Sequence, residues 1–341
     1  MDIKAISGAY EGKLTGAETI NGLWKQGGQT FPLQLRKGAT TPLKRLQEPG
    51  KPYSYQETEV TVDNKGAGIR LVGTLTLPQD KSLYPAVLLL TGSGPQDRDE
   101  TTLGHKPFLV LTDYLTKQGF AVLRLDDRGI GKSGDNYATA TTEDFASDAQ
   151  AAFNYLKNHS NVNRNKVGLL GHSEGALIAT KIAALNKDIA FVVFMGGSGV
   201  PGTELLVAQN EVLYKAAGVP QETLQKLLHV RRAQFEAAAS TSENAVAAET
   251  IKNLEEKLLS NFTPAEQKGL GLSDENTTAI AAQLTTPWMR YFLNYNPVAD
   301  IRKLKMPVLA IAGSKDLQVP AQQNLPAIEK ALQTGEIRSK P

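Results

Sequence analysis

A serine lies at the centre of the segment Val167 to Gly175, which reads Val-Gly-Leu-Leu-Gly-His-Ser-Glu-Gly. Glycines at 171 and 175 flank Ser173; an apolar run precedes it and a helical pattern begins at Ala176. A strand that turns sharply into a helix lifts a serine oxygen above a sheet. The flanking glycines are needed because a Cβ would clash in so tight a turn. The pattern therefore predicts that Ser173 is an activated nucleophile.

A serine nucleophile needs a base to take its proton, a carboxylate to orient that base, and N–H donors for the oxyanion. Asp316 follows the apolar run from Val308 to Ala312 within four residues, whereas Asp300 precedes this run. Only Asp316 is therefore expected at the sheet edge where Ser173 lies. It is predicted to be the orienting acid, and the alternative is an aspartate that only stabilises a local turn.

The oxyanion donors are expected in two places. The backbone N–H of Glu174 directly follows the nucleophile. The second donor should come from the loop that follows the first buried run, where Gly92 and Gly94 flank Ser93 and let the backbone approach a ligand. We predict the N–H of Ser93 as this donor, with the N–H of Gly94 as the alternative.

The elements that must position these residues are buried strands alternating with amphipathic helices. Strands separated by helices imply right-handed crossovers and a parallel sheet covered on both faces. An antiparallel pair at 53–62 and 69–77 opens this part of the chain. The sequence predicts an α/β fold with a mostly parallel central sheet. Its expected parallel strands are residues 86–90, 121–125, 167–170, 191–195 and 308–312.

More than a hundred residues separate the last two of these strands, which is too many for a simple crossover. Apolar residues at helical spacing predict a helical insertion at about 203–285. It leaves from the edge of the sheet where ligands bind, so a lid over the site is expected; a purely structural excursion is the alternative. Where the insertion rejoins the core, Trp288, Tyr291 and Phe292 are expected to line a substrate pocket or to pack in the core.

The chain before residue 53 is expected to form two further parts. Residues 1–37 contain short alternating stretches and turn signals, which predict β-hairpins and the remnant of a small β domain. Residues 38–52 contain three prolines and are expected to be a linker. The main domain is expected to span residues 53–341.

Composition limits the possible partners. The chain has 341 residues, a formal net charge of +2 and no basic cluster, which argues against nucleic acid and anionic membranes as partners. There is no cysteine, and no apolar run reaches the roughly 18 residues of a membrane span. The segment from Asp127 to Ser133 ends in Gly-Lys-Ser, but aspartate stands at 126 where a phosphate loop needs glycine. We predict a small-molecule substrate, no metal and no cofactor.

The N-terminal residues have no apolar stretch typical of a signal peptide. A cytoplasmic location is therefore expected, or a periplasmic or secreted one if a leader precedes Met1. The sequence leaves the oligomeric state open.

The motifs together resemble those of bacterial α/β-hydrolases of carboxylesterase type, close to the serine aminopeptidase-like branch. The resemblance covers about residues 53–341, and residues 1–37 are similar to the tail of a small β domain that precedes such hydrolases. It implies an esterase that forms an acyl-enzyme, with Ser173 as nucleophile and Asp316 as acid. The matching segments are residues 92–99, 104–108, 127–129, 171–175 and 313–316.

The histidines depart from this family pattern. The family places its base after the eighth strand, but the four histidines are His105, His159, His172 and His229. We therefore expect the base histidine beyond Pro341, with the C-terminus truncated before it. A peptidase or a thioesterase would use the same triad, and a fold that has lost its base would be a non-catalytic binding scaffold. These alternatives stay open at this point.

Overall fold

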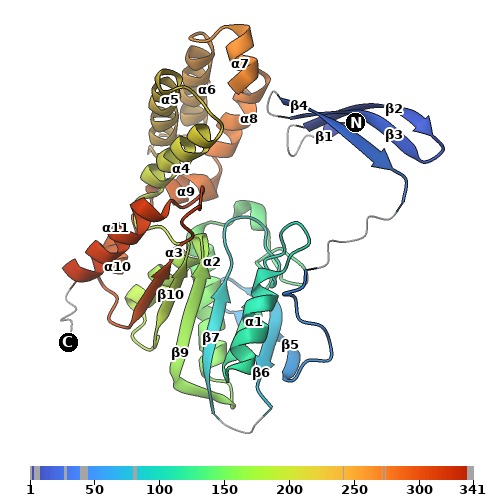
Figure 1. Ribbon diagram of the computed structural model, residues 1–341. Coiled ribbons are helices and arrows are strands. Elements are labelled where there is room, and N and C mark those ends of the chain that lie inside the picture. The colour runs from blue at the N-terminus through green and yellow to red at the C-terminus, as the bar shows by residue number, and fades with distance from the viewer. Residues whose placement is uncertain are drawn as a thin grey trace. The chain divides into compact units, whose positions relative to one another are not determined.

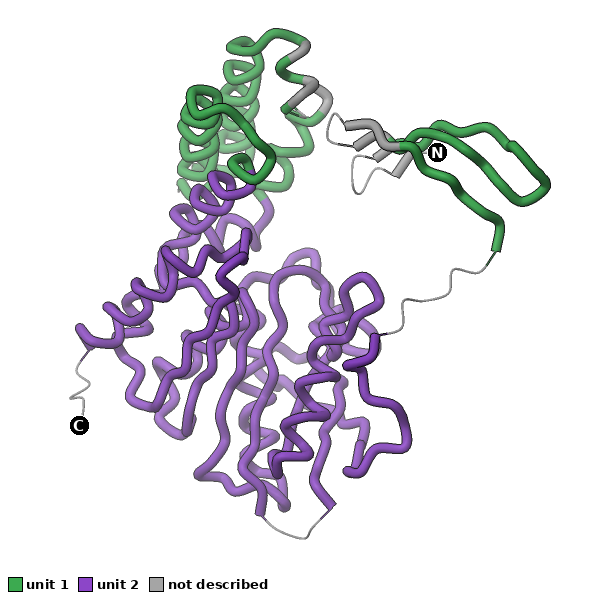
Figure 2. Tube along the Cα trace, viewed as in Figure 1, with its two compact units in different colours: residues 1–43, 214–285 green, residues 44–213, 286–341 purple. Residues whose placement is uncertain are grey.

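The computed structural model describes residues 2–3, 8–26, 29–38, 45–79, 83–240, 242–270, 272 and 274–335. The chain divides into two compact units, shown in Figure 2. The smaller unit comprises residues 1–43 and 214–285, and the larger unit comprises residues 44–213 and 286–341. Every candidate site residue predicted within the sequence belongs to the larger unit.

The larger unit is built on a seven-stranded sheet in the order β11-β10-β9-β7-β8-β6-β5 (Figure 1). The pairs β5–β6 and β6–β8 are antiparallel, and the other four pairs are parallel. The predicted α/β class and the antiparallel opening pair are thus confirmed. The strands are β5 (Gln56–Asn64), β6 (Ile69–Leu77), β7 (Tyr84–Leu90), β8 (Ala121–Leu125), β9 (Val162–His172), β10 (Val192–Met195) and β11 (Val308–Ile311).

Helices cover both faces of this sheet, which is why its strands are nearly continuous apolar runs. Along β7, Ala86 and Leu88 join the core beneath α2 and α3, whereas Val87 and Leu89 pack on the opposite face with Phe108 of α1. The helices of this unit are α1 (Pro107–Lys117), η2 (Tyr137–Thr139, a 3-10 helix), α2 (Thr142–Lys157), α3 (Glu174–Leu185), α9 (Pro287–Asn294), α10 (Val298–Ile301) and α11 (Ala321–Thr334), together with most of α4 (Gly202–Ala216).

The parallel strands end at one edge of the sheet. Gly171 of β9 is in register with Leu90 of β7 on one side and with Phe194 of β10 on the other. Met195 of β10 is in turn in register with Ile311 of β11. The segments that follow these strands therefore leave from the same edge, and they contain the predicted nucleophile, acid and oxyanion loop.

The smaller unit contains a sheet and a set of helices. Residues predicted as hairpins form four antiparallel strands in the order β1-β2-β3-β4, namely Asp2–Ile3, Gly8–Gly16, Thr19–Gln26 and Gln29–Arg36. In the predicted helical insertion, Arg231 and Glu255 form a buried ion pair at 2.6 Å. The lid role of the insertion stays a prediction. Its helices are the end of α4, then α5 (Gln221–Ala239), α6 (Asn244–Leu259), α7 (Pro264–Leu270) and α8 (Asp274–Leu284).

Candidate active site

Ser173 occupies the sharp turn between β9 and α3, as the glycine pattern predicts. Its backbone has φ 52° and ψ −116°, a left-handed conformation that costs a residue other than glycine about 1–3 kcal/mol. A Cβ on Gly171 would lie 2.1 Å from the carbonyl oxygen of Gly175, and a Cβ on Gly175 would lie 2.2 Å from that of Leu90. Only glycine therefore fits on either side of the serine.

The loop after β7, residues 91–96, is called the oxyanion loop below, and two acidic groups hold it, the half-buried Asp127 and the buried Glu100. The hydroxyl of Thr91 and the N–H of Gln96 donate to the two carboxyl oxygens of Asp127, at 2.8 and 3.0 Å. The N–H of Gly92 donates to Oε1 of Glu100 at 2.7 Å. The loop is therefore fixed near both of its ends.

The middle of the oxyanion loop is also held. The Ser93 hydroxyl lies close to the Glu174 carboxyl and lowers its pKa, and the N–H of Gly94 does the same to the Tyr137 hydroxyl. Among the residues that the structure describes, no backbone acceptor is found for the N–H of Ser93 or of Gly94. Both N–H groups therefore remain candidate donors to a ligand.

The oxyanion loop lies against the nucleophile. A Cβ placed on Gly92 would be 3.3 Å from Cβ of Ser173. Glu174 is the first residue of α3, so its N–H has no acceptor within the helix and lies at the positive end of the helix dipole. The predicted donors, the N–H groups of Ser93 and Glu174, thus belong to two segments that adjoin Ser173.

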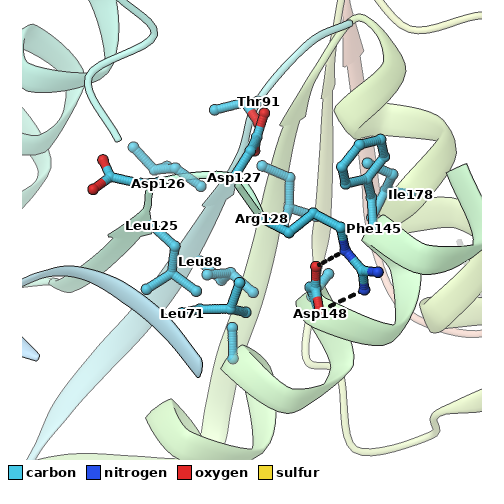
Figure 3. Close-up of a pocket in the computed structure, with 14 residues that line it drawn as sticks. Leu71, Leu88, Thr91, Leu125, Asp126, Asp127, Arg128, Phe145, Asp148 and Ile178 are labelled. Carbon is cyan, nitrogen blue, oxygen red and sulfur yellow. Dashed lines mark hydrogen bonds and ion pairs between the residues drawn. The ribbon is translucent and has the colours of Figure 1, made fainter. Parts of the chain in front are cut away.

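The acidic group that anchors the loop ends, Asp127, has an unusual pKa. Burial, opposed by the hydrogen bonds from Gln96 and Thr91, raises the pKa of Asp127 to about 7. A cavity of about 50 Å³ lies beside it (Figure 3). Across this cavity Arg128 bonds Asp148 through two nitrogens at 2.7 and 2.9 Å, so the neighbouring cation is already neutralised by another carboxylate.

The raised pKa of Asp127 predicts a pH-dependent stability. The folded protein keeps a proton that an unfolded aspartate releases near 3.8, so the stabilisation is present below that pH and lost as pH rises through about 7. Asp127→Asn should remove this loss. The free energy of unfolding of Asp127→Asn minus that of the native protein should increase by up to about 4 kcal/mol from about pH 4 to pH 8, as measured by urea titrations.

A matched control is Asp126→Asn. Burial opposes the charge of Asp126, but hydrogen bonds and the charge of Arg98 lower the pKa of this carboxyl. Its replacement should therefore become more costly, relative to the native protein, only as pH rises to about 4, and this cost should change little between about pH 4 and pH 8. The same pH trend in both variants would contradict the assignment.

Glu100 also contacts the residue before the nucleophile. Its Oε1 lies 2.7 Å from Nδ1 of His172 and accepts the N–H of Gly92 as well, so one buried oxygen joins the elbow to the oxyanion loop. Burial opposes the charge of His172, but the bond to Glu100 and the charges of Glu100 and Asp316 raise the pKa of His172. Sequence reasoning missed Glu100. Its positive φ of 53° cannot be read from residue type.

Asp316 lies after β11, on the edge that holds Ser173. Its Oδ1 accepts the N–H groups of Gln318 and Val319, both at 2.9 Å, which is the geometry of a turn aspartate. Its Oδ2 faces Gly196 and would lie 3.5 Å from a Cβ there. A hollow of about 230 Å³ joins Asp316 to His172. Asp316 can therefore be both a turn aspartate and the orienting acid, because its two carboxyl oxygens have different partners.

The competing acid, Asp300, is engaged elsewhere. It lies on α10, where it accepts bonds from the Tyr295 hydroxyl at 3.0 Å and from Lys303 at 2.7 Å. His105 is likewise engaged away from Ser173, with Nδ1 3.1 Å from Glu48. Neither residue lines the cleft that contains Ser173.

Ser173 opens into a cleft of about 620 Å³ within the larger unit. Trp288 and Phe292 line this cleft, in agreement with the pocket interpretation, and their rings stack at 5.3 Å. The cleft is lined by Gly92, Ser93, Gln96, Glu100, Thr102, Pro107, His172, Ser173, Leu205, Leu206, Gln209, Trp288, Met289, Phe292, Gln318 and Val319.

Tyr291, expected with them, does not line this cleft, and its contacts agree with the packing interpretation instead. Residues four apart share a helix face, and Tyr291 stacks on Tyr295 instead. Its hydroxyl donates to Glu143 at 2.6 Å, and Lys181 lies over its ring. Tyr291 therefore anchors α9 to α2 and α3.

Two kinds of feature are absent from the described residues. No group of three or more His, Asp or Glu side chains in them is arranged to hold a metal ion. The helices of this part of the chain include none with the length and apolar character needed to cross a bilayer.

Comparison with known proteins gives relatives of two activities. The chain is 31% identical over 201 residues to esterase EstD of Thermotoga maritima, which covers 58% of this chain and 47% of that protein. It is 28% identical over 155 residues to acyl-coenzyme A thioesterase 1 of Mus musculus, covering 46% of this chain and 32% of that protein. The chain thus spans about half the length of the first relative and less of the second.

One similar solved structure is an esterase of Pyrococcus furiosus, with 18% identity and a TM-score of 0.48 over 82% of this chain and 78% of that chain. The sequence profile of the family described as serine aminopeptidase, S33, matches residues 107–336, which is more than half of this chain and includes Ser173 and Asp316. The chain belongs to the serine aminopeptidase S33 family.

Proposed function

We propose that the protein is a carboxylesterase that hydrolyses short-chain esters through an acyl-enzyme intermediate. The observation that supports this best is the strained Ser173 beside an oxyanion loop whose Ser93 N–H has no internal acceptor among the described residues. Such donors, held in place before the reaction, are worth about 2.7–4 kcal/mol each in the transition state.

In the proposed reaction, Oγ of Ser173 attacks the ester carbonyl carbon while its proton passes to the base. The oxyanion that forms accepts bonds from the N–H groups of Ser93 and Glu174. The C–O bond to the alcohol then breaks, and the alcohol leaves with the proton from the base. Water, deprotonated by the same base, attacks the acyl-serine; the bond between the acyl carbon and Oγ of Ser173 breaks, Oγ takes the proton from the base, and the acid is released. Asp316 orients the base, which we expect to be a histidine after it in the chain, as the order serine, acid, histidine requires.

The cleft favours an uncharged acyl group. Leu205, Leu206, Met289, Phe292 and Val319 supply apolar walls, and neither lysine nor arginine is among the lining residues of this described cleft. The phosphates of coenzyme A would therefore find neither a lysine nor an arginine within it, and His172 is already bonded to Glu100.

The acidic side chain in the cleft does not supply an anchor for an amine. The charge of Glu100 is paired with His172, which argues against binding the free amino group of an aminopeptidase substrate. Similarity to a protein named as an esterase also supports ester hydrolysis.

The substrate preference can be tested with the full-length protein. We expect p-nitrophenyl esters of short uncharged acids to be hydrolysed with kcat/KM at least about 100-fold above that for aminoacyl p-nitroanilides or acyl-coenzyme A, a difference of about 2.7 kcal/mol in transition-state binding. Faster cleavage of the anilide or the thioester would replace the esterase assignment by the corresponding alternative. No turnover of any of the three would favour the non-catalytic scaffold.

A further inference from the structure

We infer that the side chain of Glu174 is a positioning residue that holds the oxyanion loop and the aromatic wall of the cleft in place. This inference rests on the proposed function, because it concerns the N–H donors of the proposed oxyanion hole. The same residue would then supply one donor through its backbone and fix the other through its carboxyl group.

Three elements converge on the Glu174 carboxyl. Its Oε1 accepts a bond from the Thr142 hydroxyl of α2 at 2.7 Å and from the indole N–H of Trp288 on α9 at 2.8 Å. The Ser93 hydroxyl of the oxyanion loop also lies close to this carboxyl and favours its charged form. Glu174 therefore links the residue after the nucleophile to the loop and to the wall of the substrate cleft.

The bond to Ser93 acts on the residue whose backbone N–H is available to a ligand. Gly92, the residue before Ser93, is held independently by the carboxyl of Glu100. We expect the contact of the Ser93 hydroxyl with Glu174 to restrict the rotation of the Ser93 peptide unit. A donor misplaced by about 1 Å can lower a rate about 100-fold.

The burial of Glu174 argues against a role in stability alone. The residue is 3% exposed, and among the described residues no lysine or arginine forms an ion pair with it. An acid buried without a cation costs free energy that an apolar residue of the same size would avoid. Burial, only partly opposed by the bonds from Thr142, Trp288 and Ser93, raises the pKa of Glu174. Glutamine has nearly the same size and keeps an acceptor oxygen for these hydrogen bonds.

The test compares Glu174→Ala and Glu174→Gln in the full-length protein with a p-nitrophenyl ester. For Glu174→Ala we expect kcat to fall about 100-fold with KM changed less than about threefold, because the oxyanion bonds form only in the transition state. Glutamine keeps an acceptor oxygen and should recover kcat to within about tenfold of the native value. Glu255→Gln, a change of another fully buried glutamate in the smaller unit, controls for general destabilisation and should leave kcat within about twofold.

Ser93→Ala removes the hydroxyl that contacts Glu174 and so tests the same contact. Because it is a small substitution in a loop, the test stays valid even if Glu174→Ala does not fold. It should lower kcat about tenfold, and the double variant with Glu174→Gln should lose clearly less than the product of the two single losses. Three results would each overturn the inference: native kcat in Glu174→Ala, equal losses of kcat in Glu174→Ala and Glu174→Gln, or independent effects of the Ser93 and Glu174 substitutions. The esterase proposal would stand in all three cases, provided that the native protein hydrolyses the ester. A native protein without esterase activity would overturn both.

Discussion

Replacing Ser173 by alanine is expected to lower kcat for ester hydrolysis by about a millionfold, because losing the nucleophile of a triad costs about as much as losing the whole triad. Alanine fits the turn, because the turn is tight at Gly171 and Gly175 and does not depend on the Ser173 hydroxyl. The measurement is steady-state hydrolysis of a short p-nitrophenyl ester by the full-length protein, with thermal unfolding to check the fold.

Residual activity in Ser173→Ala should come only from the oxyanion donors and binding. Ser198→Ala is a suitable control, because Ser198 is a buried serine after β10 whose hydroxyl bonds Val200 and Asn324. It should retain activity within about tenfold. If Ser173→Ala retained comparable activity, Ser173 would not be the nucleophile.

Asp316→Asn is expected to lower kcat by about four orders of magnitude, the loss seen when the orienting carboxylate of a triad is replaced. Asparagine keeps an acceptor oxygen for the N–H groups of Gln318 and Val319, so the turn after β11 should survive. The effect should therefore appear in kcat and leave the unfolding temperature nearly unchanged.

Asp300→Asn provides the matched control. Asp300 contacts Tyr295 and Lys303, away from the cleft, so this variant should retain kcat within about threefold. Near-native turnover in Asp316→Asn, or a large loss in Asp300→Asn, would transfer the orienting role to another acid.

The sheet and the elbow could be predicted from sequence because both depend on local patterns. Buried parallel strands are short apolar runs, and the predicted strand at 121–125 matches β8 residue for residue. At the elbow, residue type alone is decisive, since a Cβ on Gly171 or Gly175 would overlap the backbone. The position of Asp316 relative to its strand is equally local.

The carboxyl groups that hold the oxyanion loop could not be predicted, because each acts over a long distance in sequence. Asp127 is 36 residues from Thr91, and Trp288 is 114 residues from Glu174. The choice between pocket and packing stayed open for Tyr291 for a different reason. An aromatic cluster on one helix divides between two faces, and only contacts with Glu143 show which face each ring takes.

The most direct test of the account is the site of covalent labelling by a fluorophosphonate probe, which reacts with activated serines. The full-length protein should be labelled at one serine, identified as Ser173 by mass spectrometry of the proteolytic peptides, with a parallel loss of esterase activity. Ser173→Ala should remain unlabelled. Labelling of another serine, or equal labelling of Ser173→Ala, would contradict the proposal that this elbow is the catalytic centre.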